Sequence, residues 1–272
     1  MDLLIIDENK CKKDGICAGE CPVAIIKLKD SFPRLIPGGD AICLRCGHCV
    51  AVCPHGALGH ANIHLEDCPP IRKELAVTEE QAVQFLRSRR STRLFKDKPV
   101  EKDKIKRLIE IARYAPTGGN SQLVEWLVVT DRDKIHDLSG ATVDWMRHVL
   151  KNDPQALNAP YIPMILAAWD TGYDSVLRAA PVLIIASAPK EANTGMVDLT
   201  IALSYLDLVA PSLGLGACWA GLLQGAILSW KPLKEALGLP AGHPYHYPIM
   251  IGYPETKYYR LPERKPPKIT WK

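Results

Sequence analysis

Residues 43–54 read Cys43-Leu44-Arg45-Cys46-Gly47-His48-Cys49-Val50-Ala51-Val52-Cys53-Pro54. This C-x2-C-x2-C-x3-C-P spacing lets three thiolates converge within one tight loop, while the fourth, before the proline, points toward a second cluster. Thiolates at this spacing are typical ligands of iron–sulfur clusters. The stretch therefore predicts a small, loop-rich iron–sulfur module at the start of the chain.

A second cysteine run with the same spacing lies upstream. Cys11, Cys17 and Cys21 obey the rule, but Asp14 stands where the second cysteine would be. Asp14 either ligates a cluster or is only a turn residue, since Asp-Gly is a common turn pair. Zinc is the alternative metal. It needs four ligands in a closed tetrahedron, and a terminal Cys-Pro that reaches to the other run does not supply one.

The distribution of the cysteines predicts a reducing compartment. Eight of the nine lie in the first 68 residues, and the opening residues 1–8 lack the basic region of a signal peptide. A secreted disulfide scaffold would usually be short and spread its cysteines throughout. We therefore expect a cytoplasmic protein with thiolate ligands, in which Cys68 and Cys218 are plain structural thiols.

Composition excludes several classes of protein. Of 272 residues, 47% are hydrophobic and 24% charged, which rules out wholesale disorder. A net charge of +4 and an aromatic content of 7% do not indicate a nucleic-acid partner. The uncharged stretch 208–230 is long enough to span a bilayer, but its glycines, Pro211 and Gln224 favour a buried helix followed by a glycine turn. No membrane partner is expected.

Three composition regimes predict the domain organisation. Residues 1–64 hold short apolar runs between cysteines, glycines and prolines, residues 65–77 form a linker with a Pro-Pro pair, and residues 78–272 alternate between helix and strand. Thr78 and Gln81 predict a capping box at the start of a helix. The pattern further predicts helices near 105–112 and 197–213, and strands at 123–130, 181–187 and 247–252.

Three segments of the second domain suggest a phosphate and flavin site. Residues 87–93 carry four arginines, and guanidinium groups suit a terminal phosphate, although a solvated basic turn is the alternative. Residues 115–122 combine glycines, which allow close backbone approach, with the amides of Asn120 and Gln122. Residues 213–221 are expected to form another small-residue loop after a helix.

These motifs resemble two known families. The cysteine runs resemble bacterial two-cluster ferredoxins over about residues 3–60. The arginine run, the Ala-Pro-x-Gly-x-Asn-x-Gln loop, the Gly-Leu-Gly-x-Cys-Trp segment and Gly252-Tyr253-Pro254 resemble the nitroreductase family of FMN flavoproteins over about residues 79–266. The resemblance implies an α+β, nitroreductase-like dimeric FMN fold preceded by a small ferredoxin-like iron–sulfur domain.

The resemblance also implies site residues. Crossed ligation would place Cys21, Cys43, Cys46 and Cys49 on one cluster. Cys11, Cys17, Cys53 and Asp14 would hold the other, as a carboxylate-ligated [4Fe–4S] cluster or, without Asp14, an open [3Fe–4S] cluster. The implied FMN-binding residues are Arg89, Arg90, Ser91, Arg93, Thr117, Asn120, Gln122, Trp219, Ala220, Gly221 and Arg264, with Arg260 and Lys265 as rivals to Arg264.

The implied activity is that of a ferredoxin-fused FMN oxidoreductase. Electrons would pass from the clusters to FMN and on to a small nitroaromatic or conjugated acceptor, with a ferredoxin-type protein or NAD(P)H as donor. The alternatives are a flavoprotein that relays electrons to a protein partner, an enzyme of flavin or corrin-cofactor metabolism, and a dehalogenase. No side chain is predicted as a catalytic acid or base. Loops between residues 141 and 174 are expected either to cap the substrate pocket or to be ordinary packed helices.

Overall fold

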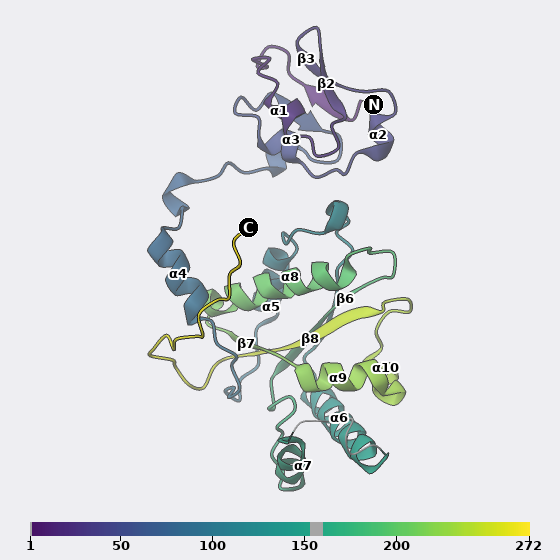
Figure 1. The fold of residues 1–272 in the computed structure, drawn as a ribbon, viewed down its shortest axis with the longest axis vertical. Helices are drawn as coiled ribbons and strands as arrows, with labels where there is room; N and C mark the ends of the chain where they lie inside the picture. Colours follow the sequence, from purple (N-terminus) through teal and green to yellow (C-terminus); the bar gives the residue numbers. More distant parts are fainter. Residues whose placement is uncertain (1, 153–159) are drawn as a thin grey trace. The chain divides into compact units, whose positions relative to one another are not determined.

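The computed structural model describes residues 2–152 and 160–272, which form two compact units. The first unit is Met1–Val77 with Gly119–Ser121, and the second is Thr78–Gly118 with Gln122–Lys272. Figure 1 shows the helices and strands of each unit, which confirm the predicted α+β class. Along the chain, the division at Val77 falls at the end of the segment that the sequence suggests as a linker.

The first unit contains two two-stranded antiparallel sheets and three one-turn helices. Its strands are β1 (Leu4–Ile6), β2 (Ile26–Lys29), β3 (Phe32–Leu35) and β4 (Leu58–His60), with β1 paired to β4 and β2 to β3 in antiparallel register. Its helices are α1 (Ile16–Gly19), α2 (Gly39–Ile42) and α3 (His48–Ala51), with 3-10 turns η1 (Leu65–Asp67) and η2 (Lys73–Leu75) near the end of the unit.

An internal repeat of 32 residues organises this unit. Helices α1 and α3 start 32 residues apart, as do strands β2 and β4. Each helix follows a glycine, Gly15 or Gly47, whose φ of 73° or 74° lies in the left-handed region that favours glycine. These repeated elements confirm that the two cysteine runs form a pseudo-repeat.

The core of the first unit is small and rich in sulfur. Ile25, Ile26, Val50 and Leu58 are buried, and the partly buried residues packed against them include most of the cysteines. Apolar burial in a core this small contributes little to the stability of the unit. The cysteine ligands are therefore expected to contribute to folding as well as to chemistry.

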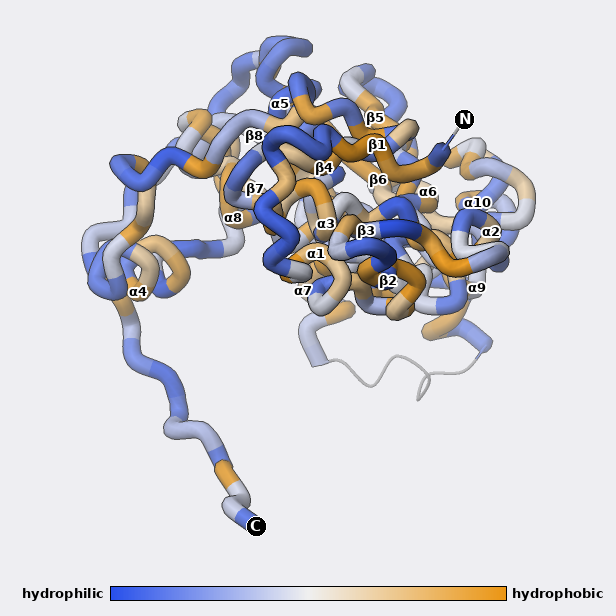
Figure 2. The backbone as a smooth tube through the Cα atoms, turned by 90° about the horizontal axis from the view of Figure 1, so that it is seen from above, coloured by the Kyte–Doolittle hydropathy of each residue, from blue (hydrophilic) through white to orange (hydrophobic). Residues whose placement is uncertain are grey.

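The second unit is built on a four-stranded antiparallel sheet. Its strands are β5 (Glu125–Val129), β6 (Val182–Ala188), β7 (Gly216–Trp219) and β8 (Tyr245–Gly252), in the spatial order β5-β6-β8-β7. Strand β6 is buried along its whole length and is a hydrophobic segment in Figure 2. Strands therefore form at all three predicted places, and β7 is an addition to them.

Helices cover both faces of this sheet (Figure 1). The helices are α4 (Glu79–Ser88), α5 (Lys102–Ala112), α6 (Arg132–Asn152), α7 (Ile162–Asp170), α8 (Gly195–Val209), α9 (Gly221–Ser229) and α10 (Lys231–Leu237), with 3-10 turns η3 (Gly118–Asn120) and η4 (Ala210–Leu213). Alternate residues of β6 enter two separate cores. Ile184 packs with α5 and α8, whereas Leu183 and Ile185 pack with α6, α9 and α10.

Several local predictions can be compared with these elements. The Thr78 capping box is present, with reciprocal bonds between Thr78 and Gln81. Helix α8 and η4 together span the predicted helix 197–213, and Gly214 caps the end of η4. The uncharged stretch 208–230 is not one helix, because β7 interrupts it between η4 and α9.

One loop prediction is wrong, and another is decided between its two alternatives. Residues 216–219 form a strand because their backbone pairs with β8, although small residues rarely predict strands. For residues 141–174 the sequence left two alternatives, a cap over the substrate pocket or ordinary packed helices. Residues 141–152 and 162–170 are helical, and Trp145 and Met146 are buried in the core, which supports the packed helices. Residues 153–159 of that segment lie outside the described residues.

Among the described residues, one segment, Gly195–Leu213, is long and apolar enough to cross a membrane by length and composition alone. It consists of α8 and η4. Leu199, Leu203 and Leu206 on α8 are fully buried in the core that α8 forms with α5 and the sheet. Asp198 and Asp207 are also buried in this segment and accept hydrogen bonds within the unit. These features are those of a core helix.

Candidate functional site

Two cavities in the first unit divide the cysteines between them. One is lined by Cys21, Cys43, Cys46 and Cys49, together with His60 and apolar residues of the adjoining strands. Cys21 comes from the first run and the other three from the second. This is the grouping that crossed ligation implies.

The other cavity is lined by Cys11, Cys17, Cys53 and Asp14, with His55 beside them. Asp14 Oδ1 accepts a hydrogen bond from the backbone N–H of Ile16 at 3.2 Å, which is a turn role. Its other carboxylate oxygen, Oδ2, lies 3.6 Å from His55 Nε2. One oxygen therefore organises the turn before α1, while the residue also lines the cavity.

Burial disfavours ionisation of two thiols in these cavities. Burial raises the pKa of Cys49 to about 11, and the neighbouring Cys46 and Cys43 add to the increase. Burial likewise raises the pKa of Cys17, with smaller increases from Cys53, Asp14 and Cys11. Burial, followed by the charge of Arg45, lowers the pKa of His60. Metal binding would have to displace the thiol protons, as is usual for thiolate sites.

The donor set fits clusters better than single metal ions. Within residues 2–152 and 160–272, no three His, Cys, Asp or Glu side chains converge closely enough to hold one metal ion. Four sulfur donors spread around one cavity are the arrangement that a polynuclear cluster requires. Backbone N–H groups also point at sulfur, from Arg45 to Cys43 Sγ and from Ala57 to Cys53 Sγ, both at 3.4 Å.

In the second unit, the arginine run lies against the outer side of β7. Helix α4 ends at Ser88, and the chain then runs beside the strand, where the Thr92 N–H donates to the Ala217 carbonyl at 2.9 Å and Ser91 forms a parallel bridge with Ala217. Gly216 permits this approach, since a Cβ there would lie 2.2 Å from Thr92 Oγ1. Ser91 and Arg93 are thereby brought near Cys218.

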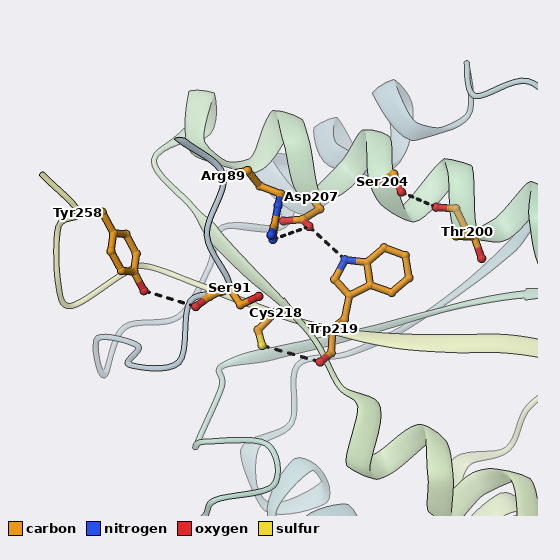
Figure 3. A network of polar contacts seen from close by, with 8 residues as sticks. All are labelled: Arg89, Ser91, Thr200, Ser204, Asp207, Cys218, Trp219 and Tyr258. Carbon is orange, nitrogen blue, oxygen red and sulfur yellow. Dashed lines mark hydrogen bonds and ion pairs between the residues drawn. The ribbon is translucent and has the colours of Figure 1, made fainter. Parts of the chain in front are cut away.

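A buried carboxylate links the arginine run to β7 and α8 (Figure 3). Asp207 Oδ2 lies 3.3 Å from Arg89 Nη1 and accepts a hydrogen bond from Trp219 Nε1 at 3.1 Å. Asp207 is only 5% exposed, and burial raises its pKa even though Trp219 and Arg89 both favour its ionised form. Arg89 is therefore partly neutralised, which leaves Arg90 and Arg93 as the less restrained cations.

Two arginines act on the buried Cys218. Burial raises the pKa of Cys218, while the charges of Arg93 and Arg178 oppose the increase. Arg178 was not predicted from the sequence. It has a φ of 58°, in a turn that Asp174 organises by accepting hydrogen bonds from Val176 and Leu177 at 2.9 Å. No local pattern marks Arg178, because only this turn brings it near β7.

Two side chains hold the 115–122 segment, Thr117 from within it and Asp198 from α8. Thr117 Oγ1 accepts from the Gln122 N–H at 3.0 Å, and Asp198 Oδ1 accepts from the Gly118 N–H at 3.0 Å. Asn120 belongs to the first unit, where its Nδ2 donates to the carbonyl oxygens of Leu44 and Arg45, at 3.0 Å each. Thr117 and Gln122 are thus joined in one turn, and the Asn120 amide is engaged by backbone of the second cysteine run.

The C-terminal residues return to the arginine run. Tyr258 OH donates to the Ser91 carbonyl at 3.4 Å, and the Arg90 guanidinium lies 5.7 Å from the centre of the Tyr258 ring. Glu263 pairs with Arg87 at 3.4 Å, and Arg264 follows it as an exposed residue of this mostly hydrophilic tail (Figure 2). The tail therefore brings Arg264 into the same region as the arginine run.

One arrangement elsewhere has the composition of a hydrolytic triad. Ser187 Oγ lies 3.0 Å from His243 Nδ1, and His243 Nε2 lies 3.8 Å from Glu125 Oε1. Ser187 is 1% exposed on the central strand β6, so its hydroxyl is closed to substrate. These residues form a buried hydrogen bond rather than a nucleophilic site.

The second unit fits a phosphorylated flavin. Guanidinium and hydroxyl donors of the arginine run suit a phosphate, and the adjoining β7 and start of α9 offer the small residues Ala220 and Gly221 for close approach of a planar ring. An α+β unit of this kind, in one chain with two cysteine-lined cavities, has the architecture of an iron–sulfur flavoprotein.

Comparisons with known proteins agree with this architecture. Residues 86–253 match the nitroreductase family, and residues 3–54 match the 4Fe-4S dicluster domain. The chain belongs to the nitroreductase family and is an FMN-dependent oxidoreductase with an N-terminal ferredoxin-type domain.

Individual relatives support the nitroreductase assignment. The FMN reductase [NAD(P)H] of Bacillus subtilis is 28% identical over 193 residues, 67% of this chain and 71% of its own length. The nitroreductase with bound FMN from Bacteroides fragilis superposes with a TM-score of 0.57 at 22% identity, covering 71% of this chain and 98% of that one. The FMN-bound nitroreductase of Desulfitobacterium hafniense gives 0.56 at 21% identity, with 72% and 99% covered. The two structures show a shared fold.

Proposed function

We propose that this protein takes electrons through two iron–sulfur clusters, passes them to FMN, and reduces a small nitroaromatic or conjugated acceptor. The observation that carries the proposal is the pair of cysteine-lined cavities in a chain whose second unit belongs to the nitroreductase family. A nitroreductase domain needs no iron–sulfur module of its own for flavin chemistry, so the module suggests a one-electron supply.

The cysteines would hold the clusters in crossed sets. Cys21, Cys43, Cys46 and Cys49 share one cavity, and Cys11, Cys17 and Cys53 share the other with Asp14. Asp14 is the fourth donor in the proposed second set. Its Oδ1 is engaged by the Ile16 N–H, so ligation would use Oδ2, the oxygen that lies 3.6 Å from His55.

In the second unit, Arg90, Ser91 and Arg93 would bind the flavin phosphate and ribityl chain, with Arg264 from the tail. Asp207 holds Arg89 and Trp219 in place, so these two residues would shape the site around the phosphate. Thr117, Asn120, Gln122, Ala220 and Gly221 complete the proposed set. When bound, FMN supplies two-electron chemistry and accepts electrons singly. No described side chain is assigned as an acid or base.

The remaining features of the proposal follow from the chemistry and the family. Seven of the nine cysteines are proposed as cluster ligands, which suits a reducing cytoplasm. Nitroreductases are generally homodimeric, and we propose the same assembly here. A ferredoxin-type protein is the donor that the cysteine module favours, with NAD(P)H as the alternative that the Bacillus subtilis relative suggests.

An anaerobic titration tests the proposal. The purified protein is assayed for iron and FMN and then titrated with dithionite, reduced ferredoxin or NADPH, while cluster and flavin absorbance are followed separately. Oxidised nitroaromatic and conjugated compounds are then screened as acceptors. We expect the clusters and FMN to be reduced by the protein donor and reoxidised by a small acceptor. Reoxidation only by another protein would instead support an electron-relay flavoprotein.

A further inference from the structure

His60, the last residue of β4, is a buried histidine inside the cavity of the first cluster set. It is 1% exposed and lines the cavity with Cys21, Cys43, Cys46 and Cys49. Buried ring nitrogens need hydrogen-bond partners. Neither the crossed ligand sets nor the flavin site uses this side chain.

The surroundings of His60 determine which ring nitrogen carries the proton. The backbone N–H of Asn62 donates to His60 Nδ1 at 3.0 Å. A backbone amide is only a donor here, so Nδ1 must accept and carries no hydrogen. The proton of the neutral ring therefore lies on Nε2.

That proton faces a cluster ligand. His60 Nε2 lies 3.7 Å from Cys43 Sγ. We propose that His60 donates a hydrogen bond from Nε2 to Cys43 Sγ and raises the reduction potential of the cluster that Cys43 binds. A hydrogen bond to thiolate stabilises the more negative, reduced cluster, and such bonds are among the features that set cluster potentials. Reduction of a bound cluster would add one electron to it, and His60 would keep its proton.

Only one half of the internal repeat has a histidine at this position. The position 32 residues before His60 is Leu28, as Cys11 is 32 residues before Cys43. Leu28 has no donor group and is 47% exposed on β2. His60 therefore acts on one cluster only, and the two clusters differ by a hydrogen bond that the repeat does not duplicate.

Two substitutions separate the hydrogen bond from the ring. His60→Phe keeps a buried planar ring without a donor, whereas His60→Gln keeps an amide N–H at a similar reach. Full-length protein is titrated potentiometrically under anaerobic conditions, with EPR to follow each cluster. For the Phe variant we expect the reduction equilibrium of one cluster to shift about tenfold toward the oxidised form, or ~59 mV for one electron. The Gln variant should recover most of the shift, and the other cluster is the internal control.

The inference rests on the proposed ligand set. Iron analysis distinguishes failure of that ligand set from failure of the role of His60. Wild-type protein without iron at this set would overturn both. Wild-type and Phe potentials that agree, with iron intact, would overturn the role of His60 alone. If the Phe variant does not bind the cluster, wild-type protein labelled with ¹⁵N-histidine decides the question. A nitrogen hyperfine coupling to the reduced cluster that disappears in the Gln variant supports the hydrogen bond, and its absence in wild type overturns it.

Discussion

Trp219 on β7 donates its indole N–H to Asp207 on α8 at 3.1 Å, and the same carboxylate oxygen lies 3.3 Å from Arg89. A buried acid thus connects the core helix to the segment proposed to bind phosphate. Figure 3 shows the three side chains converging between α8 and the strand. The relationship makes Asp207 a positioning residue for the proposed flavin site.

Loss of the hydrogen-bond acceptor at Asp207 should lower the free energy of unfolding more than loss of its negative charge. Burial raises the pKa of this carboxyl, so Asp207→Asn relieves an unfavourable ionisation while keeping an acceptor for Trp219. Asp207→Leu leaves the indole N–H and Arg89 unpaired and should lower the free energy of unfolding by about 1–3 kcal/mol. Urea unfolding followed by tryptophan fluorescence measures both variants. Equal losses in the two would contradict this assignment.

The same carboxyl predicts a pH dependence. Its folded pKa lies above the ordinary 3.8, so the folded protein binds this proton more tightly than the unfolded chain does. Its contribution to stability is therefore largest in acid and declines as the pH rises through the folded pKa. The stability of wild type relative to Asp207→Asn should fall over that range. A difference that grows with pH would show that the carboxyl is stabilised in its ionised form.

Flavin retention should depend on the segment beside β7. Arg90→Ala or Ser91→Ala removes a donor proposed for the phosphate, and a hydrogen bond to a charged group contributes roughly 1.5–3 kcal/mol. FMN affinity should therefore fall about ten- to a hundredfold while iron content stays constant. Flavin occupancy after dialysis is the measurement, and Arg113→Ala, an exposed arginine on the surface after α5, is a matched control. Unchanged occupancy in both site variants would remove the phosphate assignment.

Asp14 gives a direct test of cluster type. If the carboxylate occupies the ligand position, Asp14→Cys should convert an atypical centre into an ordinary [4Fe–4S] cluster. Iron per chain and the low-temperature EPR signal should both change, because thiolate replaces an oxygen donor or fills an open corner. Identical iron content and spectra before and after would leave Asp14 with only its turn role toward Ile16.

Iron removal should affect the two units differently. The first unit has a small core in which cysteines pack beside Ile25 and Val50, whereas the second has two extensive cores around β6. Chelation under reducing conditions should therefore unfold residues 1–64 and leave the second unit protected. Hydrogen exchange with peptide resolution measures this, and the amides of β6 are the internal control. Persistent protection of β1 and β4 in iron-free protein would show that the core alone holds the first unit.

The sequence predicted the local features better than the long-range ones. The ferredoxin resemblance implies the same grouping of the cysteines as the two cavities show. Thr78 with Gln81 marks the start of α4, because this signal lies within four residues. Strand β7 was missed because it depends on pairing with β8 rather than on β-branched residues. Arg178 and His60 were missed for the same reason. A turn places Arg178 near Cys218, and the pairing of β4 with β1 accompanies the placement of His60 beside Cys43.

The central claim is that the clusters are the route by which electrons reach FMN. Cys46→Ala removes a proposed ligand from one cavity of the first unit, and Cys68→Ala, outside both proposed ligand sets, is the control. The decisive measurement is the anaerobic rate of FMN reduction by a low-potential ferredoxin-type protein. We expect the Cys46 variant to bind FMN, to be reduced by strong chemical reductant, and to react with the protein donor orders of magnitude more slowly than the Cys68 variant. A wild-type rate in the Cys46 variant would contradict the claim.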